Sequence, residues 1–305
     1  MRIAVGCLFS LVCQSQIFGD ETIEKVRHSP AMHSYQKNLI QPNDEIVIAN
    51  DPVAVNIASN HESSREQKVA QCPIKLNSRL QVGGNYARVR IHPHGHTSFD
   101  GNLGGAQGLY EYRPINFFYG GAKLTWREGK TEGPVGSRSL IYIDAQERLG
   151  YTFSAKNDDD RLTFYTGLGY RYYWQKLDPK VGSNMEFKYN EFYVPIGMIG
   201  EHVFNSWFSI GLGFTWMPQI YPTVTIKPLG GARWIISNEQ ANFYVEMPFT
   251  FTLTDNKRCS LIVNPFYEHW EDGHTTAKTA RGVPLDLPGN TYNFGGVEVN
   301  FAYSF

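Results

Sequence analysis

The chain has few charged residues, no strong net charge and no long apolar run past its start. Asp, Glu, Lys and Arg make up 19% of the 305 residues, against about 25% in an ordinary soluble domain. The formal net charge is −1, which argues against nucleic-acid binding because that activity needs a basic face. Beyond the N-terminus no run of about 18 apolar residues occurs, which excludes a helical membrane protein.

The common catalytic motifs are also missing. The sequence contains no Gly-x-Ser-x-Gly, no His-Glu-x-x-His, no phosphate-binding glycine-rich loop and no Cys-x-x-Cys. We therefore predict that the protein is not an enzyme and needs no cofactor.

Aromatic residues and glycine, by contrast, are plentiful. Phe, Trp and Tyr make up 14% of the chain, and 29 residues are glycine, while the mean hydropathy is only −0.35. A transmembrane β-barrel produces this profile, because its lipid-facing and lumen-facing residues alternate and cancel in the average.

The N-terminus predicts export. Arg2 precedes an apolar segment from Ile3 to Cys13, which has the length of a signal-peptide core and is too short to span a bilayer. We predict a signal peptide over 1–19, cleaved near Gly19 or earlier near Ser15. Of the four cysteines, Cys72 and Cys259 would remain, either as one disulfide or as two thiols.

The rest of the chain divides into two parts. Residues 20–78 are polar and contain too few large apolar side chains to bury much of a core. We interpret them as a periplasmic linker, with a plug that enters the barrel as the alternative. From 79 to 305 the apolar residues recur with a period of two, so this part is the predicted barrel.

Four segments show the alternation clearly: 140–153, 161–175, 208–216 and 243–253. In the first, Ile141, Ile143 and Leu149 share one parity, while Asp144 and Arg148 share the other. Segments of this length match the ~9–11 residues of a tilted membrane-crossing strand. A soluble sandwich or lipocalin-type barrel would also alternate. The apolar stripes here, however, carry aromatic residues at their ends, as membrane barrels do at the lipid–water interfaces; these are Trp126, Tyr151, Phe153, Tyr172, Trp174 and Trp216.

The C-terminus carries the most specific signal. Val299, Phe301, Tyr303 and Phe305 alternate with small or polar residues, and the chain stops on Phe305. This pattern resembles the C-terminal strand signature of Gram-negative outer-membrane β-barrels. The resemblance implies a bacterial outer-membrane protein that contacts outer-membrane lipid and whose last strand is read by the barrel-assembly machinery.

The spacing of the breaks predicts the number of strands. Short breaks fall at 113–116, 154–160, 203–205 and 254–258, and longer ones at 92–98, 128–137, 177–185 and 271–290. If 217–240 is an outer loop, the fold is an all-β, antiparallel, up-and-down transmembrane barrel of ten strands, an even number as this class requires. Residues 229–236 look like a strand, which we interpret as a loop hairpin, with twelve strands as the alternative. Pro195, Pro248 and Pro265 fall inside periodic segments and blur the boundaries there.

Two sets of side chains are candidates for a site. His92, His94 and His96 lie close together on a turn and could bind Zn²⁺ or Cu²⁺, or be a solvated loop. The second set has the inward parity and is either an ion-pair network that fills the lumen or the lining of a small pore. It comprises Arg148, Arg171, Glu191, Glu201, Glu246, Glu268 and Glu298, with Tyr165 and Tyr173.

These features favour a structural, surface-exposed protein that serves attachment or envelope integrity. A small diffusion channel is the alternative. A third possibility is an outer-membrane hydrolase, because ten-stranded outer-membrane proteases use acids and histidines near the outer rim, where Asp100, His269 and Asp272 are expected.

Overall fold

The structure consists of β-strands in one antiparallel sheet. A computed structural model describes residues 76–154, 159–180, 182–227, 233–275 and 287–305, and within them no helix is long and apolar enough to cross a membrane. The predicted signal peptide, nearly all of the predicted linker, and Cys72 lie outside these ranges. The strand segments are β1 Ser78–Pro93, β2 Phe99–Tyr112, β3 Phe117–Gly133, β4 Gly136–Ser154, β5 Asp160–Pro179, β6 Met185–Tyr193, β7 Ile196–Asn205, β8 Phe208–Trp216, β9 Gln219–Lys227, β10 Arg233–Ile235, β11 Phe243–Glu246, β12 Phe249–Thr252, β13 Cys259–Asp272 and β14 Asn290–Ser304.

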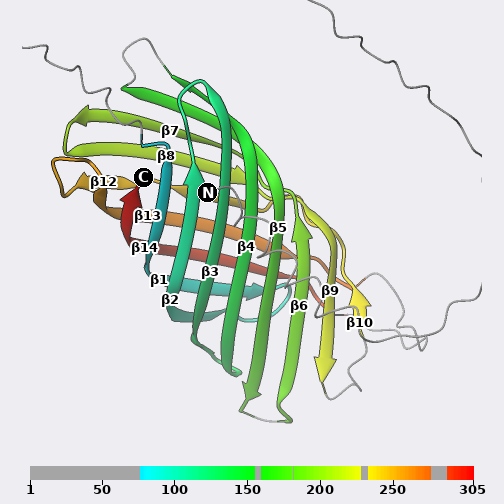
Figure 1. Ribbon diagram of the computed structural model, residues 1–305. Coiled ribbons are helices and arrows are strands. Elements are labelled where there is room, and N and C mark those ends of the chain that lie inside the picture. The colour runs from blue at the N-terminus through cyan, green and yellow to red at the C-terminus, as the bar shows by residue number, and fades with distance from the viewer. Residues whose placement is uncertain (1–75, 155–158, 181, 228–232, 276–286) are drawn as a thin grey trace, which may run out of the picture. The chain divides into compact units, whose positions relative to one another are not determined.

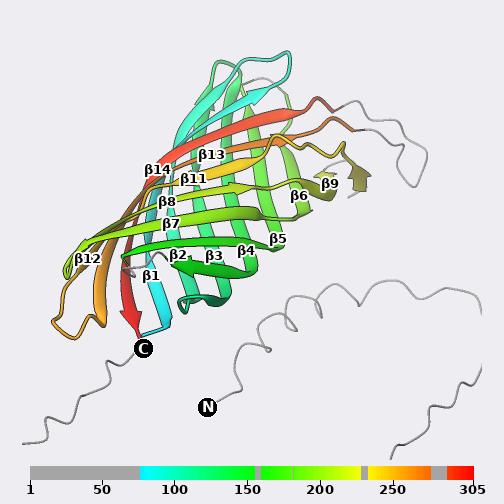
Figure 2. The same cartoon turned by 90° about the horizontal axis from the view of Figure 1, so that it is seen from above.

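The sheet closes into a barrel (Figures 1 and 2). The first strand, β1, pairs with the last, β14, along its whole length. The 14 segments make ten barrel strands, because β6 continues into β7 along β5, β8 continues into β9, and β10, β11 and β12 follow one another along β8 and β9. The predicted all-β antiparallel barrel of ten strands is therefore confirmed.

Prolines lie at three of the four interruptions within these strands, the gap between β10 and β11 being the exception. Pro195 separates β6 from β7, Pro218 separates β8 from β9, and Pro248 separates β11 from β12. Proline cannot donate a ladder hydrogen bond, so pairing is interrupted locally. The chain does not reverse there: the Val194 amide donates to the carbonyl of Pro218, 3.1 Å away. Pro265 lies inside β13, opposite Val297.

The expected outer loop at 217–240 is largely a hairpin. β9 extends the strand begun by β8 and pairs with β6, and β10 folds back on β9 with Trp234 opposite Val224. The hairpin interpretation is confirmed at 233–235, whereas the assignment of 219–227 to a loop is wrong. Pro218 and Pro222 hid a strand whose β-branched residues continue the sheet.

Two other predicted long breaks are shorter than predicted. β3 continues to Gly133 and β4 begins at Gly136, so the break at 128–137 shrinks to a two-residue turn, and β5 runs to Pro179. Glu128 and Lys130 are exposed on the outer side of β3. These charged residues end the run of apolar side chains on the outer face of β3, but the strand itself continues to Gly133.

The barrel has two different rims. The terminal rim holds the start of β1, the end of β14 and short connections, such as Ser206 and Trp207 between β7 and β8. The far rim holds the tips of the longer hairpins, the end of β13 and the start of β14. Figure 2 shows the end of β14 beside β1 at the terminal rim.

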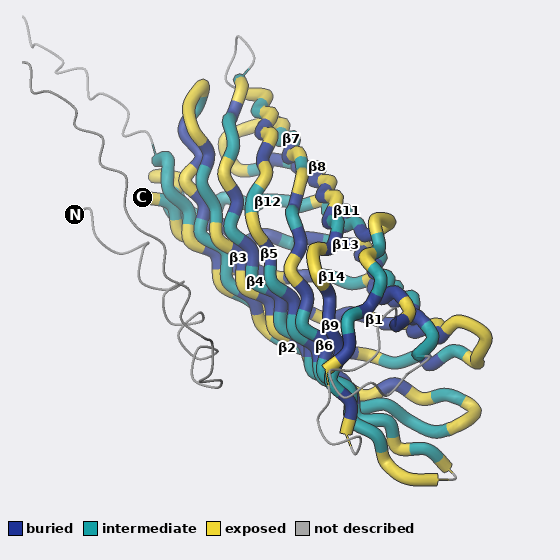
Figure 3. Tube along the Cα trace, turned by 90° about the vertical axis from the view of Figure 1, so that its right-hand side faces the viewer, coloured by how far each residue is buried: buried dark blue, intermediate teal, exposed yellow. Residues whose placement is uncertain are grey.

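Burial alternates along most of the strands (Figure 3). On β1, Ala87 and Val89 are buried, whereas Val82 is 60% exposed. The outward side chains form an apolar band around the barrel, with Leu149 69% and Phe301 56% exposed. Apolar surface of this extent is stable when lipid covers it.

One part of the wall is held mainly by side chains. Between β10 and the end of β13, the described residues form one backbone bridge, Ile236 to Thr275. Beside it, the Glu271 amide donates to Asn242 Oδ1 at 2.7 Å, and Gln219 Nε2 donates to the Glu271 carbonyl at 2.9 Å. We call this stretch the seam.

Candidate functional site: the filled lumen

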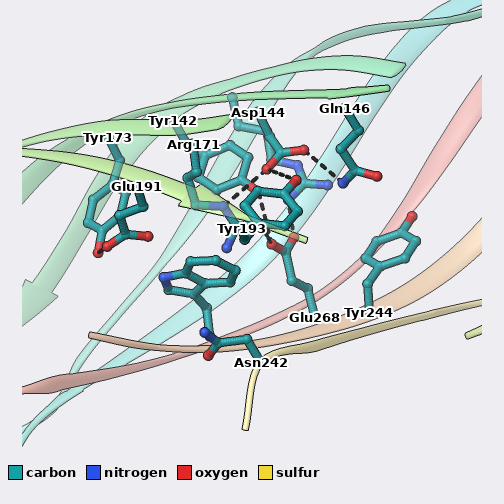
Figure 4. Close-up of polar contacts among 12 residues, drawn as sticks. Tyr142, Asp144, Gln146, Arg171, Tyr173, Glu191, Tyr193, Asn242, Tyr244 and Glu268 are labelled. Carbon is teal, nitrogen blue, oxygen red and sulfur yellow. Dashed lines mark hydrogen bonds and ion pairs between the residues drawn. The ribbon is translucent and has the colours of Figure 1, made fainter. Parts of the chain in front are cut away.

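A network of buried charges crosses the middle of the barrel (Figure 4). Glu268 of β13 accepts a hydrogen bond from Tyr142 of β4 at 2.8 Å, and both residues are labelled in Figure 4. Glu268 also accepts a hydrogen bond from Arg127 of β3 at 2.9 Å. It also forms an ion pair with Arg171 of β5, which in turn pairs with Asp144 at 3.1 Å. These five side chains, the central network, are at most 3% exposed. They join one side of the barrel wall to the other.

Aromatic rings complete the surroundings of the two guanidinium groups. That of Arg171 lies 3.5 Å from the ring centre of Trp270, and that of Arg127 lies 4.5 Å from that of Phe266. Cation–π contact and ion pairing together offset part of the cost of removing these charges from water.

A second cluster surrounds Glu298 of β14. Its carboxylate lies 3.4 Å from Lys123 Nζ and accepts hydrogen bonds from Tyr244, at 3.2 Å, and from Asn264, at 2.8 Å. Asn264 also donates to Glu246 at 2.9 Å. The cluster therefore links β3 with β11, β13 and β14.

Two ion pairs lie toward the terminal rim. Arg79 pairs with Glu111 at 2.7 Å, and Arg113 pairs with Glu201 at 3.0 Å. The Tyr119 hydroxyl donates to Glu111 at 3.2 Å. Charges here thus also neutralise one another inside the lumen.

Toward the far rim the lumen is filled by tyrosine rings. Tyr173 and Tyr189 stack with centres 4.5 Å apart, and Tyr292 packs edge-on to Tyr173 at 5.4 Å. Each is at most 3% exposed. We call these three residues the aromatic layer. Glu191 accepts a hydrogen bond from Tyr173 at 3.3 Å.

The spaces between these groups are small. A cavity of about 50 Å³ lies between Arg79, Lys123 and Arg148, and another of about 10 Å³ lies against the aromatic layer, beside Leu140 and Phe294. About 10–15 Å³ of such space holds one water molecule, so the larger cavity has room for a few waters and the smaller for at most one. Side chains therefore fill the middle of the lumen.

The structure places all seven charged candidates on the lumen side. Two of their clusters are joined, because Arg127 of the central network also lies 3.7 Å from Glu298. Arg171 and Glu268 belong to the central network, Glu246 and Glu298 meet at Asn264, and Glu201 lies near the terminal rim. The remaining two occupy their own positions: Glu191 touches the aromatic layer, and Arg148 donates to Gln146 and lies over the Tyr165 ring, 4.9 Å from its centre.

Sequence reasoning missed several partners of these residues. Lys123, Arg127 and Glu111 are buried in the lumen, as is Asp144, for which the parity of 140–153 already predicts an inward position. The signal was present in 117–133, because Leu124 and Trp126 have the outward parity and so place Lys123 and Arg127 inward.

The three histidines do not converge. His92 bonds Ser98 at 2.8 Å, and His94 lies 3.3 Å from the Thr291 hydroxyl. Among the described residues, no group of three or more His, Cys, Asp or Glu side chains is placed to hold a metal ion. The spacing suggested a cluster, but the turn directs the side chains to different neighbours.

The residues considered for hydrolysis do not form a site either. Asp100 pairs with Arg90 at 2.8 Å on the exposed surface. His269 lies against Asn293 and Glu271, and its ring stacks on Phe243, whereas Asp272 is buried and accepts from Trp270. Strand parity separates them, because positions 269 and 272 of one strand face opposite sides.

The C-terminal candidates lie on the outer face of β14. Val299, Phe301, Tyr303 and Phe305 are 43–56% exposed, within the apolar band. Cys259 is a free thiol among the described residues, and the disulfide considered with Cys72 is untested because Cys72 lies outside them.

Comparison with known proteins identifies the fold. No protein-family model and no curated protein matches the sequence. Among solved structures, the outer membrane protease OmpT from Escherichia coli has a TM-score of 0.56 at 11% identity, over 77% of this chain and 98% of that one. The toluene transporter TodX from P. putida (0.35, 9%, 75% and 90%) and the attachment invasion locus protein Ail from Yersinia pestis (0.34, 10%, 74% and 99%) are less similar. The chain has the fold of small Gram-negative outer-membrane β-barrels.

Proposed function

We propose that the protein is a closed barrel of the bacterial outer membrane with a structural and surface-exposed role, in attachment or envelope integrity. The observation that carries the proposal is the filled lumen: the central network and the aromatic layer occupy the space that a pore would need. A ten-stranded barrel is also close to the size at which side chains fill the interior.

The outer surface supports the location. The apolar band matches outer-membrane lipid, and the far rim, with its longer hairpins, would face the cell exterior. Phe305 and the alternate residues before it would be read by the barrel-assembly machinery, and export would use the cleaved signal peptide.

The same lumen disfavours a diffusion channel. A hydrolase is equally unsupported, because the similarity to OmpT is one of fold, and Asp100, His269 and Asp272 point to different surroundings.

Single-channel recording of the purified full-length protein in planar bilayers tests the proposal. We expect no steady openings under conditions in which a general porin, reconstituted in parallel, conducts. Steady, protein-dependent openings would contradict it and restore the channel interpretation.

A further inference from the structure

We propose that the far-rim mouth of the barrel binds small organic anions, with Arg138 recognising the anionic group. A cavity of about 250 Å³ lies there, many times the ~10–15 Å³ that one water molecule needs. Its walls come from β1, β2, β4, β5 and β6, together with the residues that lead into β14.

Arg138 provides a cation without an acidic partner. One terminal nitrogen donates to Gln175 Oε1 at 3.2 Å, and the guanidinium lies over the Phe99 ring, 4.2 Å from its centre. Among the described residues no carboxylate lies within ion-pair distance of it, and its Nε has no hydrogen-bond partner. Arg127 and Arg171, deeper in the lumen, each pair with Glu268.

The geometry of Arg138 favours a carboxylate or a similar anion. A guanidinium presents a planar set of N–H donors that matches such groups. Stacking on Phe99 orients this plane and leaves donors that Gln175 does not use. The acids of this half of the lumen, Glu191 and Asp272, are at most 1% exposed and do not line the cavity.

The rest of the lining favours an apolar body. Phe99, Leu177, Phe187 and Leu287 face the cavity, with Tyr189 from the aromatic layer. Binding pockets for small molecules are typically lined in this way, with a few polar groups that fix orientation. The ligand class is therefore an anionic group joined to a compact apolar part.

The aromatic layer closes this cavity on the lumen side. Tyr189 lines it and stacks on Tyr173, and Gln175 of the wall donates to Tyr292. A ligand would enter from the far rim and leave the same way. The site therefore captures a ligand and does not conduct it.

Three probes of matched shape test the proposal on the full-length protein by calorimetric titration in detergent. Benzoate has the anion and the apolar ring, benzamide has the same shape without charge, and acetate has the anion without the ring. We expect benzoate to bind at least about tenfold more tightly than either other probe, since a charge-assisted hydrogen bond contributes roughly 1.5–3 kcal/mol.

Variants assign the charge selectivity to one side chain. Arg138→Met should remove most of the preference for benzoate over benzamide and leave benzamide binding unchanged within about twofold, while Arg138→Lys should retain part of it. The control is Arg88→Met, which removes an exposed arginine of the outer wall. Heat-modifiable gel mobility verifies that each variant is folded.

Three results would overturn the proposal: no binding of benzoate, equal binding of benzoate and benzamide, or an Arg138→Met variant that keeps the preference. None of them bears on conductance, so the proposed closed barrel stands or falls separately.

Discussion

At the scale of the residue, Glu268 has the largest expected effect on stability. Its carboxylate meets both Arg127 and Arg171, which come from strands on the other side of the lumen. Removing one member of a buried pair leaves its partners without full compensation. Glu268 thus stabilises the barrel mainly by compensating the buried charges of Arg127 and Arg171.

We expect Glu268→Gln to lower the free energy of unfolding by about 3–5 kcal/mol, because two buried guanidinium groups lose a charged partner. Urea unfolding in detergent micelles measures it. Glu128→Gln is the control, since Glu128 is exposed on the outer side of β3 and forms no ion pair in the described structure. Equal stability of the two variants would show that the central network does not stabilise the barrel.

Strand parity explains which residues could be anticipated. In 140–153 the pattern correctly placed Asp144 and Arg148 inward, because lipid selects apolar side chains on the opposite face. It could not show that Arg127 would meet Glu268, 141 positions away. That contact depends on the register and curvature of the closed sheet.

At the scale of the element, the strands were predictable where their outer face is apolar. They were harder to predict where the strands extend beyond the apolar band. β9 was hidden by Pro218 and Pro222, and the end of β3 by its exposed charges. Where the outer face of the sheet contacts water, its outward residues are not apolar. The sequence there lacks the alternation of apolar residues that predicts a strand. Arg138, which lines the far-rim cavity, lies in such a region and was not anticipated.

At the seam, the described residues on its two sides form one backbone bridge, Ile236 to Thr275. We expect Asn242→Ala to speed hydrogen exchange of the Glu271 amide by about fivefold, because that amide loses its acceptor and an ordinary hydrogen bond contributes roughly 1 kcal/mol. Exchange at Leu261, which is paired on both sides, should not change.

The matched control for the seam is Asn102→Ala, at an exposed position of β2. Exchange followed by mass spectrometry compares the two variants. Unchanged protection at Glu271 in Asn242→Ala would show that this side chain does not hold the wall together.

At the scale of the whole molecule, closure of β1 on β14 predicts heat-modifiable mobility. We expect the unheated protein to migrate faster in gels than the boiled protein, because a closed barrel resists the detergent until heat opens it. The full-length protein in the membrane fraction is the sample to use. Identical mobility before and after boiling, with the protein in the soluble fraction, would contradict the membrane barrel.

Burial of the central network also isolates it from the ions of the medium. Arg127, Arg171 and Glu268 are at most 2% exposed, so mobile ions cannot approach closely enough to screen them. The charges outside, such as Arg88 and Lys130, lie within reach of salt. The stability of this barrel should therefore be nearly the same in fresh water and in brine, whereas whatever its outer surface attracts will vary with ionic strength.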